Sequence, residues 1–151
     1  MSPIITKVTV EGLVLPFLLD NISGTSIQKS SLHGFGLFAT EQIKRETILC
    51  VLDGQIVSWD SYIKISSEKP FGKFNGDLFM EWNALDEETL LIRPYRTKYS
   101  FINHSRNPNT VLQRFPLALL ALENLQIGEE LTLDYRKEPL SQHYLQSANF
   151  L

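Results

Sequence analysis

Turn-forming residues recur along this chain, and the segments between them are short and apolar. Examples are Asp53-Gly54, Asn75-Gly76-Asp77, Phe115-Pro116 and Gly128. Gly, Pro, Asn and Asp favour turns because they allow or fix backbone angles that other residues avoid. Turn signals separated by roughly 8–12 residues, with strand-like segments between them, are typical of all-β domains. We therefore predict a mostly β fold of several short sheets, with few short helices.

Local patterns predict the individual elements. Alternating apolar and polar residues predict a strand over Ile4–Val10, and the polar stretch Asn21–Ser31 is predicted to be a connector. Thr47–Ile56 is predicted to form a hairpin, because an Asp-Gly pair separates two strand-like runs. A short helix is predicted near Trp59–Ser66. Further strands are predicted within Leu78–Trp82, Leu90–Ile92, Thr110–Leu112, Leu117–Leu122 and Leu125–Tyr135, the third and fourth of these as a hairpin.

The composition predicts a single domain over residues 1–151. Of these 151 residues 43% are hydrophobic, which is enough for a core of ordinary size. The formal net charge is −3 and basic residues do not cluster, so a broad electrostatic footprint for nucleic acid is excluded. No apolar run reaches the ~20 residues that a membrane span needs. Cys50 is the sole cysteine, which excludes an intrachain disulfide and a cysteine zinc cluster, predicts no metal site and favours an intracellular, cytoplasmic setting.

The stretch Tyr99–Asn109 concentrates polar side chains directly after an apolar Phe-Ile pair. It contains three asparagines, a histidine, a serine and a proline. Buried polar groups need hydrogen-bond partners, so the loop either binds a ligand or satisfies its own groups as a turn. Both readings are open from this stretch alone.

The apolar stretch Ser30–Thr40 contains Gly34 and Gly36, one residue apart. Glycine lets the backbone bend, or lets another group approach where a Cβ would collide. The alternatives are a ligand that approaches the backbone and a bulge or hairpin corner. A dinucleotide fingerprint is excluded, because its third glycine is missing.

Three stretches taken in order resemble the signature motifs of the SET domain family. They are HGFGLFA (His33–Ala39), FINHSRNPN (Phe101–Asn109) and GEELTLDY (Gly128–Tyr135). The resemblance implies a protein-lysine N-methyltransferase of minimal size, with small curved sheets around a pseudoknot. The core motifs would lie within about residues 23–136, and the tail, residues 137–151, would pack on or near the active site.

The resemblance also implies the site residues. S-adenosylmethionine would be the cofactor, and Tyr135 would stand at the mouth of the methyl-transfer channel. The residues implied in cofactor binding are His33, Gly34, Phe35, Gly36, Ser100, Phe101, Asn103, His104 and Tyr135. Taken alone, Tyr135 also fits a tyrosine packed at a strand end, and Asn103 and His104 also fit a loop cap and a satisfied buried histidine.

Methyl transfer to an amine needs a neutral, oriented lysine. A narrow apolar channel disfavours the ammonium form, and a nearby sulfonium charge acts in the same direction. A tyrosine hydroxyl can aim the nitrogen lone pair without placing an anion beside it. Phe79, Trp82 and Phe101 are the candidate walls for the lysine chain, since aromatic rings flank alkyl chains and face cations. Ordinary core packing is the equal alternative for these three rings.

The chain departs from many SET proteins in two places. Arg106 stands where a cysteine is common, and the tail after Tyr135 has no cysteine, so the zinc module that completes the lysine channel is absent. The tail or a second subunit would then fill that place, which makes a homodimer useful. The expected partner is a histone-like or other basic protein substrate, with a nuclear location if the protein is eukaryotic and acts on histones. A non-catalytic SET-like module that binds peptides or proteins is the alternative function.

Overall fold

The computed structural model describes residues 5–10, 13–67, 81–94, 96–140 and 146. Short strands dominate these residues, and 3-10 turns and one α-helix complete them, as the sequence predicts. Two compact units are distinguished: residues 1–52 with 97–134, and residues 53–96 with 135–151. We describe each unit by itself. No helix in the described part of the chain is long and apolar enough to cross a membrane.

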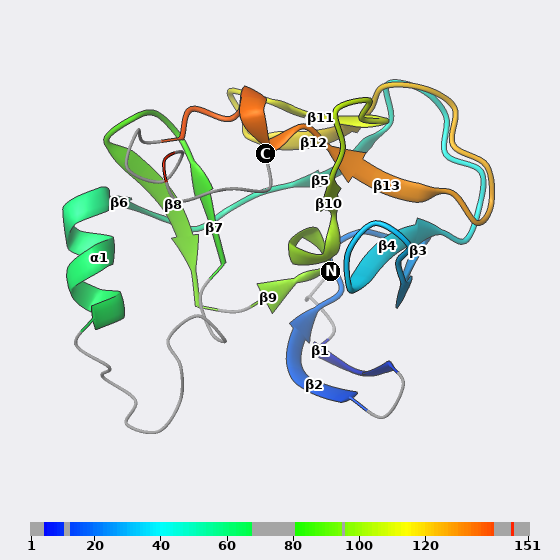
Figure 1. The fold of residues 1–151 in the computed structure, drawn as a ribbon, viewed down its shortest axis with the longest axis horizontal. Helices are drawn as coiled ribbons and strands as arrows, with labels where there is room; N and C mark the ends of the chain where they lie inside the picture. Colours follow the sequence, from blue (N-terminus) through cyan, green and yellow to red (C-terminus); the bar gives the residue numbers. More distant parts are fainter. Residues whose placement is uncertain (1–4, 11–12, 68–80, 95, 141–145, 147–151) are drawn as a thin grey trace. The chain divides into compact units, whose positions relative to one another are not determined.

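The first unit contains a four-stranded sheet in the order β10-β13-β4-β3. Its strands are β3 (Thr25–Lys29), β4 (Phe35–Ala39), β10 (Asn103–His104) and β13 (Glu130–Leu133). The hairpin β3–β4 is local, whereas β13, the last strand, lies between β10 and β4 (Figure 1). β13 runs parallel to β10 and antiparallel to β4. This insertion of β13 between strands from earlier parts of the chain is a non-local arrangement.

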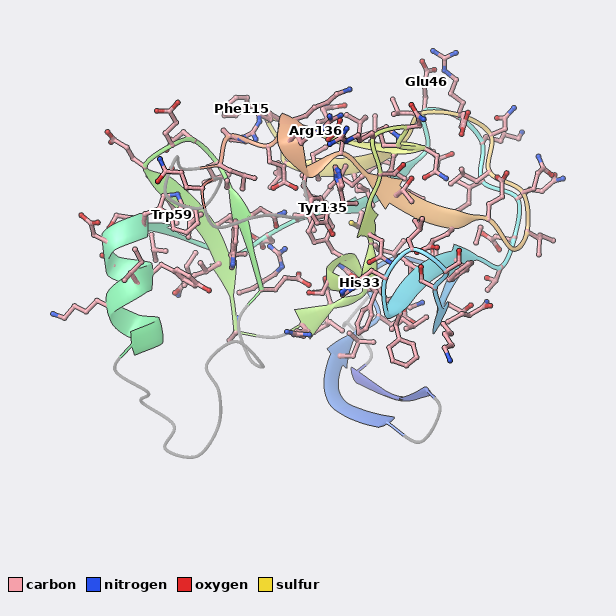
Figure 2. The ribbon with its side chains drawn as sticks, viewed as in Figure 1. His33, Glu46, Trp59, Phe115, Tyr135 and Arg136 are labelled. Carbon is pink, nitrogen blue, oxygen red and sulfur yellow. The ribbon has the colours of Figure 1, made fainter. Side chains whose placement is uncertain are left out.

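Two further sheets belong to the same unit. One pairs β1 (Ile5–Val10) with β2 (Leu13–Leu19) and ends in β9 (Arg96–Thr97). The other has the order β11-β12-β5, from β11 (Thr110–Gln113), β12 (Ala118–Ala121) and β5 (Ile48–Val51). Glu46 and Phe115 lie in turns at opposite ends of this second sheet (Figure 2), and both have a positive φ.

The core of this unit is aliphatic. Leu37 of β4, Leu119 of β12 and Leu131 of β13 are fully buried, as is Ile102 just before β10. Alternation along β13 directs Leu131 and Leu133 into the core, while Glu130 and Thr132 fall on the other side of the strand. The polar face of β13 therefore needs partners, and these lie in the candidate site.

The second unit is an antiparallel sheet in the order β6-β8-β7 with one helix beside it (Figure 1). Its elements are β6 (Gln55–Ser58), β7 (Glu81–Ala84), β8 (Thr89–Arg93), α1 (Trp59–Ser67) and the 3-10 turn η3 (Tyr135–Lys137). Ser58 precedes α1, and its hydroxyl accepts a hydrogen bond from the Ser61 N–H at 3.1 Å, as an N-cap does. Ala84, Leu90 and the tail residue Leu140 form the buried cluster of this unit.

The structure confirms some predicted elements and corrects others. The helix near Trp59–Ser66 and the hairpin over Thr110–Leu122 are confirmed. The connector predicted over Asn21–Ser31 is wrong, because residues 25–29 form β3, whose Ile27 is buried. The hairpin predicted over Thr47–Ile56 is also wrong: β5 pairs with β12 and β6 pairs with β8, so each strand finds a distant partner.

Candidate functional site

The polar loop Tyr99–Asn109 runs along β13. It begins in the 3-10 turn η2 (Lys98–Phe101), where the hydroxyl of Thr97 accepts a hydrogen bond from the Tyr99 N–H at 3.2 Å. It continues as β10, with Asn103 opposite Thr132 and His104 opposite Leu133. Ser105 then donates its N–H to the Leu133 carbonyl at 3.0 Å. The loop is thus fixed by backbone pairing to the last strand.

The Asn103 side chain joins this loop to the hairpin β3–β4. Its Nδ2 lies 3.1 Å from the carbonyl oxygens of His33 and Phe35, and 2.7 Å from Oε1 of Glu130. Three acceptors therefore surround one amide NH2 group, and they come from β13 and from the start of β4. The contacts bring Asn103 together with His33 and Phe35, three of the residues that the SET resemblance implies.

The two glycines of the first motif stand in different surroundings. A Cβ on Gly36 would lie 2.1 Å from Oε1 of Glu130 and 3.2 Å from Nδ2 of Asn103, so the carboxylate fills the space that a side chain would take. A Cβ on Gly34 would meet nothing within 4 Å, and Gly34 has φ +47°. Gly36 thus makes room for Glu130, whereas Gly34 turns the chain at an open surface.

The turn around Gly34 closes the hairpin β3–β4. Ser30 donates its N–H to the Gly34 carbonyl at 2.9 Å, and its hydroxyl oxygen accepts hydrogen bonds from the N–H groups of Leu32 and His33 at 2.9 and 3.4 Å. Leu32, His33 and Gly34 are exposed, and Figure 2 labels His33 in this turn. The hairpin corner named as an alternative for these glycines is therefore present, with an accessible tip.

The other implied residues of the loop differ in exposure. Ser100 is exposed, whereas Phe101 and His104 are partly buried. Nδ1 of His104 lies 3.9 Å from Oδ1 of Asp134, whose side chain is 2% exposed. That distance is too long for a hydrogen bond, so the two side chains lie close together without a hydrogen bond between these two atoms. His104 extends the site along β10, next to Asn103.

Tyr135 and Trp82 belong to the second unit. Tyr135 begins η3, is partly buried, and accepts a backbone hydrogen bond from Glu138 at 3.2 Å. Trp82 lies in β7, where its ring packs edge-on against Trp59 with centroids 5.2 Å apart and lies 6.3 Å from the ring of Tyr62. These contacts correspond to the packing alternative for Trp82. Phe79 lies outside the described residues.

Glu130 and Ser30 are two further residues of this region, outside the set implied by the sequence. The Ser30 hydroxyl lies 2.8 and 2.9 Å from the two carboxylate oxygens of Glu130, and Glu130 also binds Asn103. The available signal was the alternation within GEELTLDY, which places Glu130 on the polar side of the strand. Among the described residues, no group of three or more His, Cys, Asp and Glu side chains is arranged to hold a metal ion.

The sequence matches the SET domain family over residues 34–136. This chain belongs to the SET domain family. The matched range contains all three motif regions and every implied site residue except His33, which precedes it directly.

Curated relatives agree with this assignment. A histone-lysine N-methyltransferase specific for H3 lysine 36 from Mycosarcoma maydis is 28% identical over 72% of this chain and 12% of its own length. MEDEA, a histone-lysine N-methyltransferase of Arabidopsis thaliana, is 25% identical over 86% of this chain and 19% of its own. The chain thus spans less than a fifth of the length of these relatives.

A solved structure has the same fold. It is a humanized mutant of the Chaetomium thermophilum Polycomb Repressive Complex 2 bound to the inhibitor GSK126. The two share 21% sequence identity with a TM-score of 0.57, over 76% of this chain and 15% of the other. The SET fold is therefore supported by the backbone arrangement as well as by the sequence.

Proposed function

We propose that this SET protein is an S-adenosylmethionine-dependent protein-lysine N-methyltransferase. The observation that supports the proposal most is the arrangement of one sheet. The three motifs contribute β4, β10 and β13, and these strands are neighbours in the order β10-β13-β4. The motifs are far apart in the sequence, so their convergence gives a single region where one ligand can contact all of them.

The residues of this region fit the proposed cofactor. Its methionine moiety carries an ammonium and a carboxylate, and its adenosine carries an amine and hydroxyls. The open surface at Gly34 lets a ligand approach the backbone closely. Asn103 is hydrogen-bonded to the neighbouring His33 carbonyl, and Asn103 and His104 would offer side-chain and main-chain polar groups to that ligand. Ser100 and Phe101 from η2 would complete the binding surface, together with Phe35 and Gly36 of β4.

When bound, S-adenosylmethionine supplies an electrophilic methyl group on a sulfonium. The protein has to orient the lysine amine toward that methyl, and orientation alone can lower a barrier by roughly 7–11 kcal/mol. Tyr135 would hold the amine through its hydroxyl, which both accepts and donates a hydrogen bond. Phe101, Trp82 and Phe79 would flank the alkyl chain and exclude water from it.

The proposed substrate is a protein segment that carries a target lysine, in a histone-like or other basic protein. Its support is the function of the relatives, which are histone-lysine N-methyltransferases. A nuclear location would accompany a histone substrate in a eukaryote, and a cytoplasmic one would accompany other substrates. A homodimer that completes the lysine channel remains part of the proposal.

Calorimetric titration with S-adenosylmethionine and with S-adenosylhomocysteine tests the cofactor step without a guess about the substrate. We expect binding with a dissociation constant in the micromolar range, which corresponds to a binding free energy of roughly −8 kcal/mol. Absence of heat and of a melting shift at millimolar ligand would contradict the proposal. It would favour the non-catalytic module, for which binding of basic peptides is the next measurement.

Tyr135→Phe tests the transfer step. The variant keeps the ring but loses the hydroxyl that orients the amine, so methyl uptake by a basic protein substrate should fall by about 100-fold. Cofactor affinity should stay within about threefold of the wild type, because the hydroxyl acts on the lysine. Full transfer activity in this variant would remove Tyr135 from the mechanism.

A further inference from the structure

We propose that Glu130, held by Ser30, is a positioning residue that fixes the orientation of the Asn103 amide. With its NH2 group turned to the protein, Asn103 presents Oδ1 as the acceptor for an N–H group of the bound cofactor. The inference rests on the proposed function, and it assigns a role to two residues outside the predicted site. It begins from the contacts of Asn103.

Among the described residues, the Asn103 amide nitrogen makes three hydrogen bonds, and all three acceptors are oxygen atoms. Two are main-chain carbonyls, of His33 and Phe35, and neither can donate. The third is Oε1 of Glu130 at 2.7 Å. Turning the amide around would bring its own oxygen against three acceptors, so the surroundings allow one orientation only.

Glu130 is the member of this set that a substitution can change. An ionised carboxylate accepts hydrogen bonds and donates none, and it makes them stronger than a neutral acceptor does. A glutamine at this position is a neutral and therefore weaker acceptor, and its own NH2 group cannot pair with Nδ2 of Asn103. The carboxylate thus holds the Asn103 NH2 group more firmly than the two carbonyls alone would.

Ser30 fixes the carboxylate in turn. Its hydroxyl oxygen accepts the Leu32 N–H at 2.9 Å, and its O–H points to Glu130, with both carboxylate oxygens within 2.9 Å. The hydrogen bonds therefore run in one direction, from the Leu32 amide through the Ser30 hydroxyl to the carboxylate. Asn103 reaches the same carboxylate from β10, so the hairpin turn and the polar loop are held by one group.

Gly36 provides the space that this arrangement requires. A Cβ there would lie 2.1 Å from Oε1 of Glu130 and 2.7 Å from its Cδ, which is too close for any side chain. The Glu130 carboxylate therefore fills the space that a side chain at position 36 of β4 would occupy. This close fit explains why the second glycine of the first motif is needed beside Glu130.

The other polar atom of the Asn103 side chain is its oxygen, Oδ1. Within the described part of the chain, the hydrogen bonds of this side chain all involve Nδ2, and none involves Oδ1. A carbonyl oxygen takes a hydrogen-bond donor, which in this cofactor is an N–H group or a ribose hydroxyl, and the proposal commits to an N–H group. S-adenosylmethionine has two kinds of N–H: the α-ammonium of its methionine moiety and the amine of its adenine.

Glu130→Gln is the main test, with Glu129→Gln as the matched control. Glu129 is the exposed neighbour whose carboxylate accepts the Gln126 N–H at 2.7 Å, outside this network. We expect the dissociation constant for S-adenosylhomocysteine, measured by calorimetry, to rise about tenfold in Glu130→Gln and to stay within about twofold in the control. Equal affinities in wild type and Glu130→Gln would overturn the inference.

Two ligand analogues separate positioning from a merely structural role. One lacks the α-amino group of S-adenosylhomocysteine, and the other lacks the adenine amine. If the substitution weakens the parent ligand but no longer weakens one analogue, the missing group is the partner of Oδ1 and the inference is supported. An equal loss for the parent and both analogues would show a structural effect and overturn it.

Ser30→Ala keeps the test decisive if Glu130→Gln fails to fold. It removes only the hydroxyl, and Ser31→Ala beside it is the control, because Ser31 is exposed. We expect about threefold weaker binding in Ser30→Ala, with the same dependence on the analogue, and no change in the control. Affinity that Ser30→Ala leaves unchanged would overturn the inference. A wild-type protein that binds neither cofactor form would instead contradict the proposed function itself.

Discussion

Asn103 and Asn109 belong to the same polar loop, and both bind β13, yet they use their amides differently. Asn109 donates Nδ2 to the Glu130 carbonyl at 2.8 Å and accepts the Thr132 N–H on Oδ1 at 2.8 Å. The two ends of the Asn109 amide thus make the hydrogen bonds to β13 that the backbone of a neighbouring strand would make. Asn103 commits only its NH2 group to the protein.

The difference separates bracing from binding within one loop. An asparagine with both amide ends bonded to backbone is fully used by the fold, as the loop-cap alternative requires. An asparagine with only its NH2 group bonded is held in place and still has an acceptor to offer. The same residue type in the same motif therefore serves the fold at Asn109 and, on our proposal, the ligand at Asn103.

Asn109→Ala should have the largest effect, and the effect should be on stability. The substitution leaves the Thr132 N–H and the Glu130 carbonyl of the central strand without their side-chain partner. Each such group costs about 1–3 kcal/mol, so we expect the free energy of unfolding in urea to fall by about 2–6 kcal/mol. Cofactor affinity of the folded variant should stay within about twofold, measured by calorimetry well below the melting temperature. A variant as stable as the wild type would contradict the bracing role.

Asn103→Ala should show the opposite pattern. We expect cofactor affinity to fall by about tenfold or more, because the positioned acceptor is lost. The loss of unfolding free energy should be about 1 kcal/mol, since the two carbonyls and the carboxylate around Nδ2 are partly accessible to water. The measurement is the pair of calorimetric titration and urea unfolding on the same protein. If Asn103→Ala and Asn109→Ala showed the same losses of cofactor affinity and of unfolding free energy, both asparagines would serve to brace the loop.

The sequence predicts the local part of this fold well. The hairpin β11–β12 and helix α1 follow from turn residues and apolar spacing within a few residues of each other. Strand β3 was missed because residues 25–29 are mostly polar, with Ile27 as the one buried aliphatic among them. An exposed strand face of this kind looks like a connector to any method that reads hydrophobic alternation.

Non-local pairing explains the remaining differences. The Asp-Gly turn after β5 suggested a hairpin, but Leu52 donates its N–H to the Leu117 carbonyl at 2.8 Å, so the strand is already committed to a distant segment. The contacts of Glu130 show the same limit of prediction from local sequence patterns. Its contact with Ser30 spans 100 positions and depends on β13 lying between β10 and β4. No local pattern contains that arrangement.

Gly34 and Gly36 extend the comparison to the first motif, and Gly34 gives the smallest effect that we predict. Gly34→Ala places a Cβ in open space but at φ +47°, so stability should fall by about 1 kcal/mol from backbone strain alone. Gly34→Asn is the matched control, because asparagine tolerates this conformation, and its stability should lie closer to the wild type. Both variants carry a Cβ, so both should bind S-adenosylhomocysteine a few-fold more weakly if the ligand approaches the backbone here. If Gly34→Asn restores affinity together with stability, the glycine serves only the turn, and the open surface beside it is not part of the cofactor site.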